Sequence, residues 1–189
     1  MPNEYSLVSV PEKDVNAGRP TSKKSYLVIF DWDDVKTYKR DDKNVKVTTF
    51  EFLPEKKPIA VYATSKSQNL YHTSTGEGKG KGFLHHADFE IPGTELEVDE
   101  FFENNINRKL GVIQIPCNGT LCKIAGTPCQ PMEITQDNSQ DNSEANKHTV
   151  TMTSELVSPA LGRIEKALVP ATDNADLNVL LGLPSGGGI

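Results

Sequence analysis

The feature that most constrains the fold is a series of short hydrophobic runs with the two-residue period of a β-strand. In the clearest run, FLHHADFEI at 83–91, every second residue shares one face of the chain. The run SYLVIFDW at 25–32 is hydrophobic almost throughout, which is typical of a buried strand. The segments expected to form strands are 25–32, 45–52, 58–64, 83–91, 111–115, 120–125, 132–134 and 148–155. The pattern predicts a mainly β protein, an antiparallel β-barrel or sandwich with one flanking amphipathic α-helix, long loops and extended terminal arms.

One segment, 94–109, has apolar residues at helical spacing. Its beginning, Thr94 followed by Glu97, matches a capping box, and basic residues at its end suit the helix dipole. Gly111 is the expected C-cap. The apolar stripe consists of Val98, Phe101, Phe102 and Ile106. We therefore expect this helix to lie on a sheet face.

The rest of the chain is unusually polar. Hydrophobic residues make up 36% of the 189 residues, below the roughly 45–50% of average globular proteins even after allowing for Gly, which that average includes. The polar residues concentrate in a few segments, namely 1–24, 65–82, 136–147 and the PSGGGI tail. The segment 33–44 is expected to be a charged loop. We predict an N-terminal arm at 1–24, a β-rich core domain at 25–155 and a C-terminal extension at 156–189.

Smaller features refine this division. The segment 65–82 is expected to be a flexible loop or a long hairpin tip, and 136–147, with its repeated QDNS, a loop. In 45–52 the apolar residues shift from odd to even positions, which predicts a β-bulge near Thr48. Short helices are expected over 161–168 and over 175–181, the latter capped by Gly182.

Composition excludes several classes of function. No run approaches the roughly 18 apolar residues of a membrane span, and we expect no secretory signal at 1–10. The net charge of −6 argues against a dedicated nucleic-acid binder. The chain has three cysteines, Cys117, Cys122 and Cys129, and an odd number favours free thiols. Their spacing fits the patterns of structural zinc sites poorly.

Chemical motifs are weak. Asp31 and Asp33 after a hydrophobic strand match the local pattern of haloacid-dehalogenase phosphatases, but the alternating βαβ context is missing. The glycine-rich stretch GEGKGKG at 76–82 lacks the spacing of a Walker phosphate-binding loop. The sequence shows no pattern typical of a Ser-His-Asp catalytic triad. His85 and His86 should point to opposite faces of a strand. We therefore predict no enzyme, no cofactor and no metal.

Charged residues offer candidate subunit contacts. Glu77, Lys79 and Lys81 lie in the glycine-rich segment and add local positive charge to an acidic protein. These lysines are candidates to meet the acidic first turns of the helix in a neighbouring copy, at Glu97 and Glu100. The alternative is a solvated loop, which is the commoner fate of a charge run.

Three stretches resemble the phage tail tube protein family, in particular small structural proteins of phages that infect Bacteroidetes. They are EGKGKGFLHHADFEIPG at 77–93, VDEFFENNINRK at 98–109 and KIAGTPCQPMEIT at 123–135, which leads towards HTVTMTSE. The similarity spans roughly 25–155, and the family is related in fold to the tube proteins of contractile injection systems.

This resemblance implies a structural virion protein without catalytic residues. Homo-oligomeric rings would stack into a tube, bind other virion proteins and let DNA pass through an acidic lumen without specific binding. The protein would be made in the host cytoplasm and end in the phage tail. The alternatives are a tail terminator, a head–tail connector or a capsid decoration protein, and less plausibly a carbohydrate-binding β-sandwich.

Overall fold

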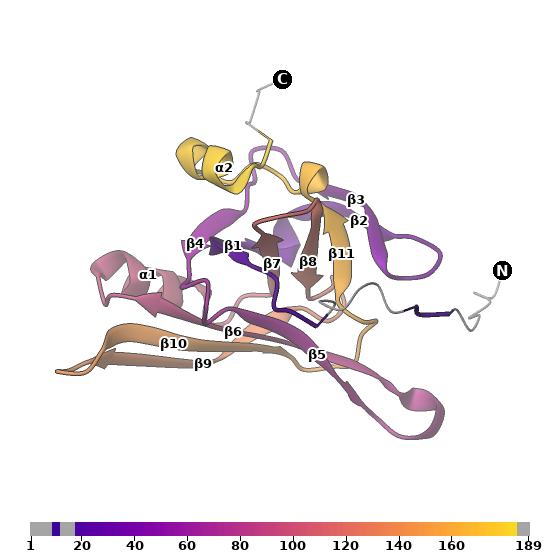
Figure 1. Cartoon of the computed structure of the whole chain (residues 1–189), viewed down its shortest axis with the longest axis horizontal. Coiled ribbons are helices and arrows are strands. Elements are labelled where there is room, and N and C mark those ends of the chain that lie inside the picture. Colours follow the sequence, from indigo (N-terminus) through magenta and orange to yellow (C-terminus); the bar gives the residue numbers. More distant parts are fainter. Residues whose placement is uncertain (1–8, 12–17, 185–189) are drawn as a thin grey trace.

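The computed structural model describes residues 9–11 and 18–184, so most of the predicted arm at 1–24 and the last five residues lie outside the described residues (Figure 1). Within the described part, eleven strands form one mainly antiparallel sheet that is not closed into a barrel. The strands are β1 (Lys23–Asp31), β2 (Val35–Arg40), β3 (Lys46–Phe52), β4 (Ile59–Tyr62), β5 (Asn69–Thr75), β6 (Gly82–Pro92), β7 (Leu110–Pro116), β8 (Leu121–Ala125), β9 (Met132–Asp141), β10 (Asn146–Ser154) and β11 (Gly162–Glu165).

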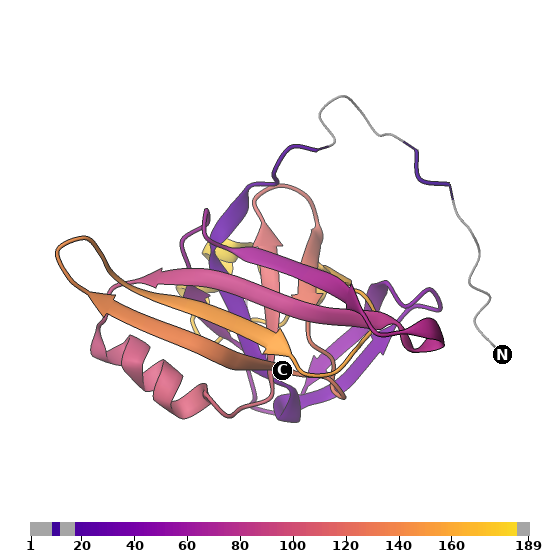
Figure 2. The same ribbon diagram turned by 90° about the horizontal axis from the view of Figure 1, so that it is seen from below.

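The sheet has two halves. The seven-stranded half has the order β4-β1-β7-β8-β11-β3-β2, and the four-stranded half has the order β9-β10-β6-β5. A single residue pair, Leu110 with Met132, joins β7 to β9 and connects the halves. In Figure 1 the four-stranded half lies below the seven-stranded half, and Figure 2 views it from that side.

Two hydrophobic clusters lie on opposite faces of the seven-stranded half. β1 contributes to both, because Leu27 and Ile29 face one cluster while Val28 and Phe30 face the other. The first cluster fills the space between the seven-stranded half and the four-stranded half. The second cluster is on the other face, where residues of β2, β3 and the C-terminal segment at 169–183 pack against β1 and β7. The hydrophobic run at 25–32 is thus explained by burial of both faces of the strand.

The helices differ in part from expectation. α1 spans Leu96–Asn105, shorter than the predicted 94–109, and begins after Glu95 without the predicted capping-box hydrogen bond. Gly111 is not its C-cap but lies within β7. α2 (Ala175–Leu181) is confirmed, with Gly182 in the left-handed conformation as its C-cap. No helix in the described ranges is long and apolar enough to cross a membrane.

Three polar or short segments were wrongly expected to be loops or helix. The segment 33–44 contains a 3₁₀ turn, η1 (Trp32–Asp34), and β2. The QDNS repeat at 136–147 continues β9 almost to the tip of the β9–β10 hairpin. The segment 161–168 forms β11 and the 3₁₀ turn η3 (Lys166–Leu168) instead of a helix. In each case sheet pairing overrides the local sequence preference.

Other expectations are confirmed. The glycine-rich end of 65–82 forms the expected hairpin tip, with the 3₁₀ turn η2 (Gly78–Gly80), whereas the middle of that segment forms β5, a strand that was not predicted. The bulge lies at Thr48, where the register between β2 and β3 shifts.

Residues after 155 are part of the sheet and of the hydrophobic core, because β11 pairs with both β3 and β8 and Ile164 is fully buried.

His85 joins three separate segments on the buried face of β6. The Gly126 N–H donates to its Nδ1 at 2.9 Å, and its Nε2 lies 2.8 Å from the Pro159 carbonyl oxygen. These contacts require the neutral ring with the proton on Nε2. Burial lowers the pKa of His85 from 6.5 to about 4.

Gly111 tests the packing of the second cluster. It lies opposite Phe30, and a Cβ there would be 2.2 Å from the Phe30 Cζ. We expect Gly111→Ala to lower the free energy of unfolding by about 1–3 kcal/mol in urea denaturation, because the ring must shift. Gly80→Ala, where a Cβ meets no atom within 4 Å, is the control. Equal losses in both variants would contradict this packing.

His85 predicts a pH dependence of stability. Because its pKa is about 4 when folded and about 6.5 when unfolded, the unfolded chain binds the proton more tightly. Stability is therefore full above pH 6.5 and falls as pH decreases towards 4, by up to about 3 kcal/mol from this group. Urea denaturation from pH 7 to 4 measures the loss. A His85→Gln variant with the same slope as the wild type would show that another group is responsible.

Candidate functional site

The β5–β6 hairpin carries three of the predicted contact residues. Glu77, Lys79 and Lys81 lie at or beside its tip, and all three are exposed. The tip projects beyond the body of the molecule (Figures 1 and 2). Its two lysines form no ion pair with a carboxylate of the described residues. Among the described residues, both lysines are therefore candidates for contact with a partner.

The other two predicted contact residues lie at the opposite end of the molecule. Glu97 and Glu100 are on the exposed side of α1, together with Asp99 and Glu103. In both views α1 and the hairpin tip lie at opposite ends of the long axis (Figures 1 and 2). Within one chain the structure therefore does not bring the basic and acidic groups together.

The four-stranded half has two free edges in the part of the chain that is described. β5 pairs only with β6, and its seven residues are exposed except Leu70. β9 pairs with β10 along its length but meets β7 only at Met132, so its outer part at 133–141 is open on one side. Open edges present unpaired N–H and C=O groups, which are templates for pairing with another chain.

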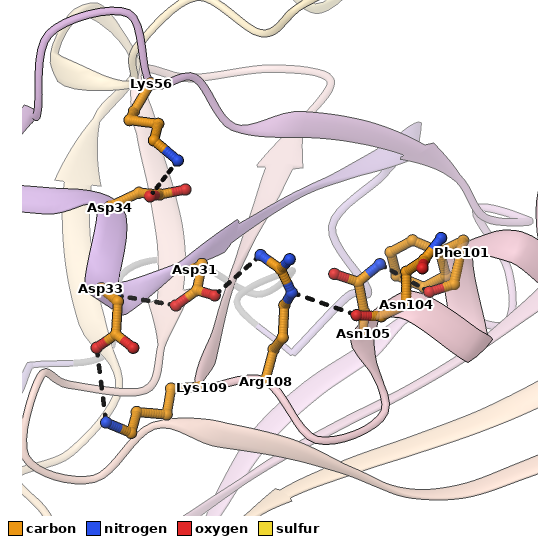
Figure 3. A network of polar contacts seen from close by, with 9 residues as sticks. All are labelled: Asp31, Asp33, Asp34, Lys56, Phe101, Asn104, Asn105, Arg108 and Lys109. Atoms are coloured by element: carbon orange, nitrogen blue, oxygen red, sulfur yellow. Dashed lines mark hydrogen bonds and ion pairs between the residues drawn. The ribbon is translucent and has the colours of Figure 1, made fainter.

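The acidic residues after β1 have structural partners (Figure 3). The Asp33 N–H donates to Oδ1 of Asp31 at 2.9 Å, and Arg108 Nη1 donates to Oδ2 of Asp31 at 3.3 Å. Lys109 Nζ lies 3.6 Å from Oδ1 of Asp33. These contacts tie the end of β1 to the segment after α1, so the local phosphatase-like pattern is accounted for by structural contacts.

Sequence reasoning missed a polar cluster around His148. Its Nδ1 lies 2.9 Å from Oδ1 of Asp137, and its Nε2 lies 3.4 Å from Ser139 Oγ and 3.5 Å from Oδ1 of Asp99. The ring is only 1% exposed and stacks on Phe102 of α1 at 5.0 Å between centroids.

These residues meet because 136–147 is mostly strand. Ser139 lies opposite His148 and Asp137 opposite Val150, on one face of the β9–β10 hairpin. Every residue of QDNSQDNS is polar, so hydrophobic periodicity carried no signal for this strand. The ring is covered by α1, so the cluster holds the helix on the sheet.

The cysteine thiols are all free, and Cys122 is buried in the second cluster. Burial raises the pKa of Cys122 to about 11, which keeps this thiol protonated and unreactive. In the described ranges no group of three His, Cys, Asp or Glu side chains is placed to hold a metal ion.

The role of His148 can be tested by stability. His148→Leu should lower the free energy of unfolding by about 1–3 kcal/mol, because Asp137 loses its buried partner. Urea denaturation measures this loss. Ser139→Ala is the control and should stay within about 0.5 kcal/mol of the wild type. A neutral His148→Leu would mean that α1 is held by its apolar contacts alone.

No protein-family model, curated protein or solved structure matches this chain.

Proposed function

We propose that the protein is a structural subunit that assembles head to tail into rings, and that stacked rings form a tail tube through which DNA passes. The observation that carries this proposal is the placement of complementary charges at opposite ends of the long axis. Lys79 and Lys81 are at one end, and Glu97 and Glu100 are at the other. Contacts between two different surfaces generate rings when the rotation closes, and filaments when it does not.

The free strand edges supply a second, lateral contact, because the strands of the four-stranded half run along the long axis and their open edges face sideways (Figures 1 and 2). β5 of one copy and the outer part of β9 in the next copy are the open edges of the four-stranded half. Joining them would continue this sheet from copy to copy and satisfy the unpaired backbone groups. A sandwich-like body with an extendable sheet suits a wall built from repeated subunits.

Charge and the resemblance add support. The net charge of −6 would make a lumen that repels phosphates, which lets DNA move without sticking. The similarity of 77–93, 98–109 and 123–135 to tail tube proteins points to the phage tail as the place of assembly, with other virion proteins as partners.

A closed ring is the second candidate, because a tail terminator or connector would use the same side-to-side contacts. The two free edges favour ring closure but do not by themselves require stacking. Open-ended tubes in electron micrographs support the tube subunit, and single rings of fixed size support the terminator or connector.

Charge reversal tests the proposed contact. Lys79→Glu together with Lys81→Glu should raise the protein concentration needed for assembly at least about tenfold, because like charges then face each other across the interface. Negative-stain microscopy and light scattering measure assembly. Lys36→Glu, on the exposed side of β2, is the matched control and should assemble as the wild type does.

A charge swap makes the test specific. Adding Glu97→Lys and Glu100→Lys to the reversed tip restores opposite charges and should restore assembly. Thermal melting of each variant confirms that the fold is retained. A wild-type protein that stays monomeric at all concentrations, or a swap that restores nothing, would contradict the proposed contact.

A further inference from the structure

A cavity of about 480 Å³ lies beside the end of the seven-stranded half, between β1, β7, β8, β11 and the chain that precedes β1. Three cations line it, Lys23, Lys123 and Arg163, and no Asp or Glu side chain does. The protein as a whole is acidic, with a net charge of −6. Positive charge is therefore concentrated here against the overall balance.

Sheet register brings these groups together. Gln114 of β7 lies opposite Lys123 of β8, and Lys123 lies opposite Arg163 of β11, so the three side chains are on one face. Like charges directly opposite each other on neighbouring strands destabilise a sheet. In the described residues, none of the three cations forms an ion pair, and the nearby carboxylate of Glu165 is 2.9 Å from Lys46 Nζ.

Both lysines are held by backbone oxygens rather than by acids. Lys123 Nζ donates to the Leu70 carbonyl oxygen at 3.2 Å, and Lys23 Nζ donates to the Gln68 carbonyl oxygen. Burial lowers the pKa of Lys123, and the charges of Arg163 and Lys23 lower it further. The two lysine ammonium groups are therefore held at the cavity although their burial and mutual repulsion destabilise the fold.

A buried amide is a separate sign of a ligand. Gln114 is 5% exposed and lines the cavity, yet its Nε2 makes no hydrogen bond within the described part of the chain. An unpaired buried donor costs about 1–3 kcal/mol. Nε2 itself is covered, so an acceptor oxygen in the cavity satisfies it once the amide turns toward the cavity. Asn118 and Thr120, in the turn between β7 and β8, add polar groups at the wall.

We propose that this cavity binds the phosphate group of a small phosphorylated molecule. The three cations match a phosphate dianion, the guanidinium of Arg163 suits two phosphate oxygens, and the Gln114 amide supplies a neutral donor. A volume of about 480 Å³ lies within the range of small-molecule sites and leaves room for a sugar or nucleoside beside the phosphate. The site is independent of subunit assembly.

Calorimetric titration of the full chain tests the proposal, with AMP and ribose 5-phosphate as probes. Both should bind saturably, whereas adenosine, which lacks the phosphate, should give no binding. Succinate tests for a dicarboxylate site, and a single-stranded oligonucleotide tests whether the phosphates of nucleic acid are the source. Binding of succinate as tight as AMP, of the oligonucleotide alone, or of no probe would overturn the proposal.

Variants locate the site. Arg163→Gln and Lys123→Gln should each weaken AMP binding at least about tenfold, because each removes a charge-assisted hydrogen bond. Without ligand, both should raise the melting temperature, since they relieve repulsion between cations. The control Lys36→Gln should bind AMP as the wild type does. A lower melting temperature in both variants, with unchanged AMP affinity, would assign the cations a purely structural role.

Discussion

Burial of both faces of β1 and β7 is the constraint on which the rest of the structure depends. Alternate residues of β1 enter separate hydrophobic clusters, and six of the seven residues of β7 are buried. A strand with two buried faces needs a layer on each side. The four-stranded half supplies one layer, and β2, β3 and the C-terminal segment supply the other. The fold is therefore layered around these two strands, although the strands belong to one continuous sheet.

The polar features lie where this layering ends. One face of the seven-stranded half is apolar at Val112 and Ala125, and two residues further along it carries Gln114 and Lys123. The change from apolar to basic side chains comes at the margin of the four-stranded half, where Lys123 still contacts the Leu70 carbonyl oxygen of β5. The β5–β6 hairpin is another polar feature beyond the layered core: its outer part is exposed because it extends past the buried residues. The proposed functional surfaces thus lie at the margins of a conventional core.

Sequence periodicity was sufficient for the apolar strands and insufficient for the polar ones. The run at 83–91 and the bulge at Thr48 were predicted because hydrophobic parity reports directly on which face is buried. The segment 136–147 was missed because its strand is stabilised by pairing with β10 rather than by burial. β11 was missed because four residues carry too little periodicity to distinguish a strand from a helix.

The candidate sites divide in the same way. The contact residues Glu77, Lys79, Lys81, Glu97 and Glu100 could be chosen from sequence because exposed charges need no tertiary context, and their placement at opposite ends could not. The cavity of Lys23, Lys123 and Arg163 depends on register between strands far apart in sequence. Single-sequence reasoning has no access to that register.

The position of β11 has a consequence for the order of events during synthesis. This strand follows β3 and β8 in the sequence, yet it lies between them and makes the only parallel pairing described in the sheet. The β2–β3 ribbon therefore cannot join the rest of the sheet until the chain has emerged past Glu165. Domains dominated by such distant pairings fold slowly. We expect the sheet of the nascent subunit to remain incomplete until Glu165 has been synthesised, which delays any association with other copies until then.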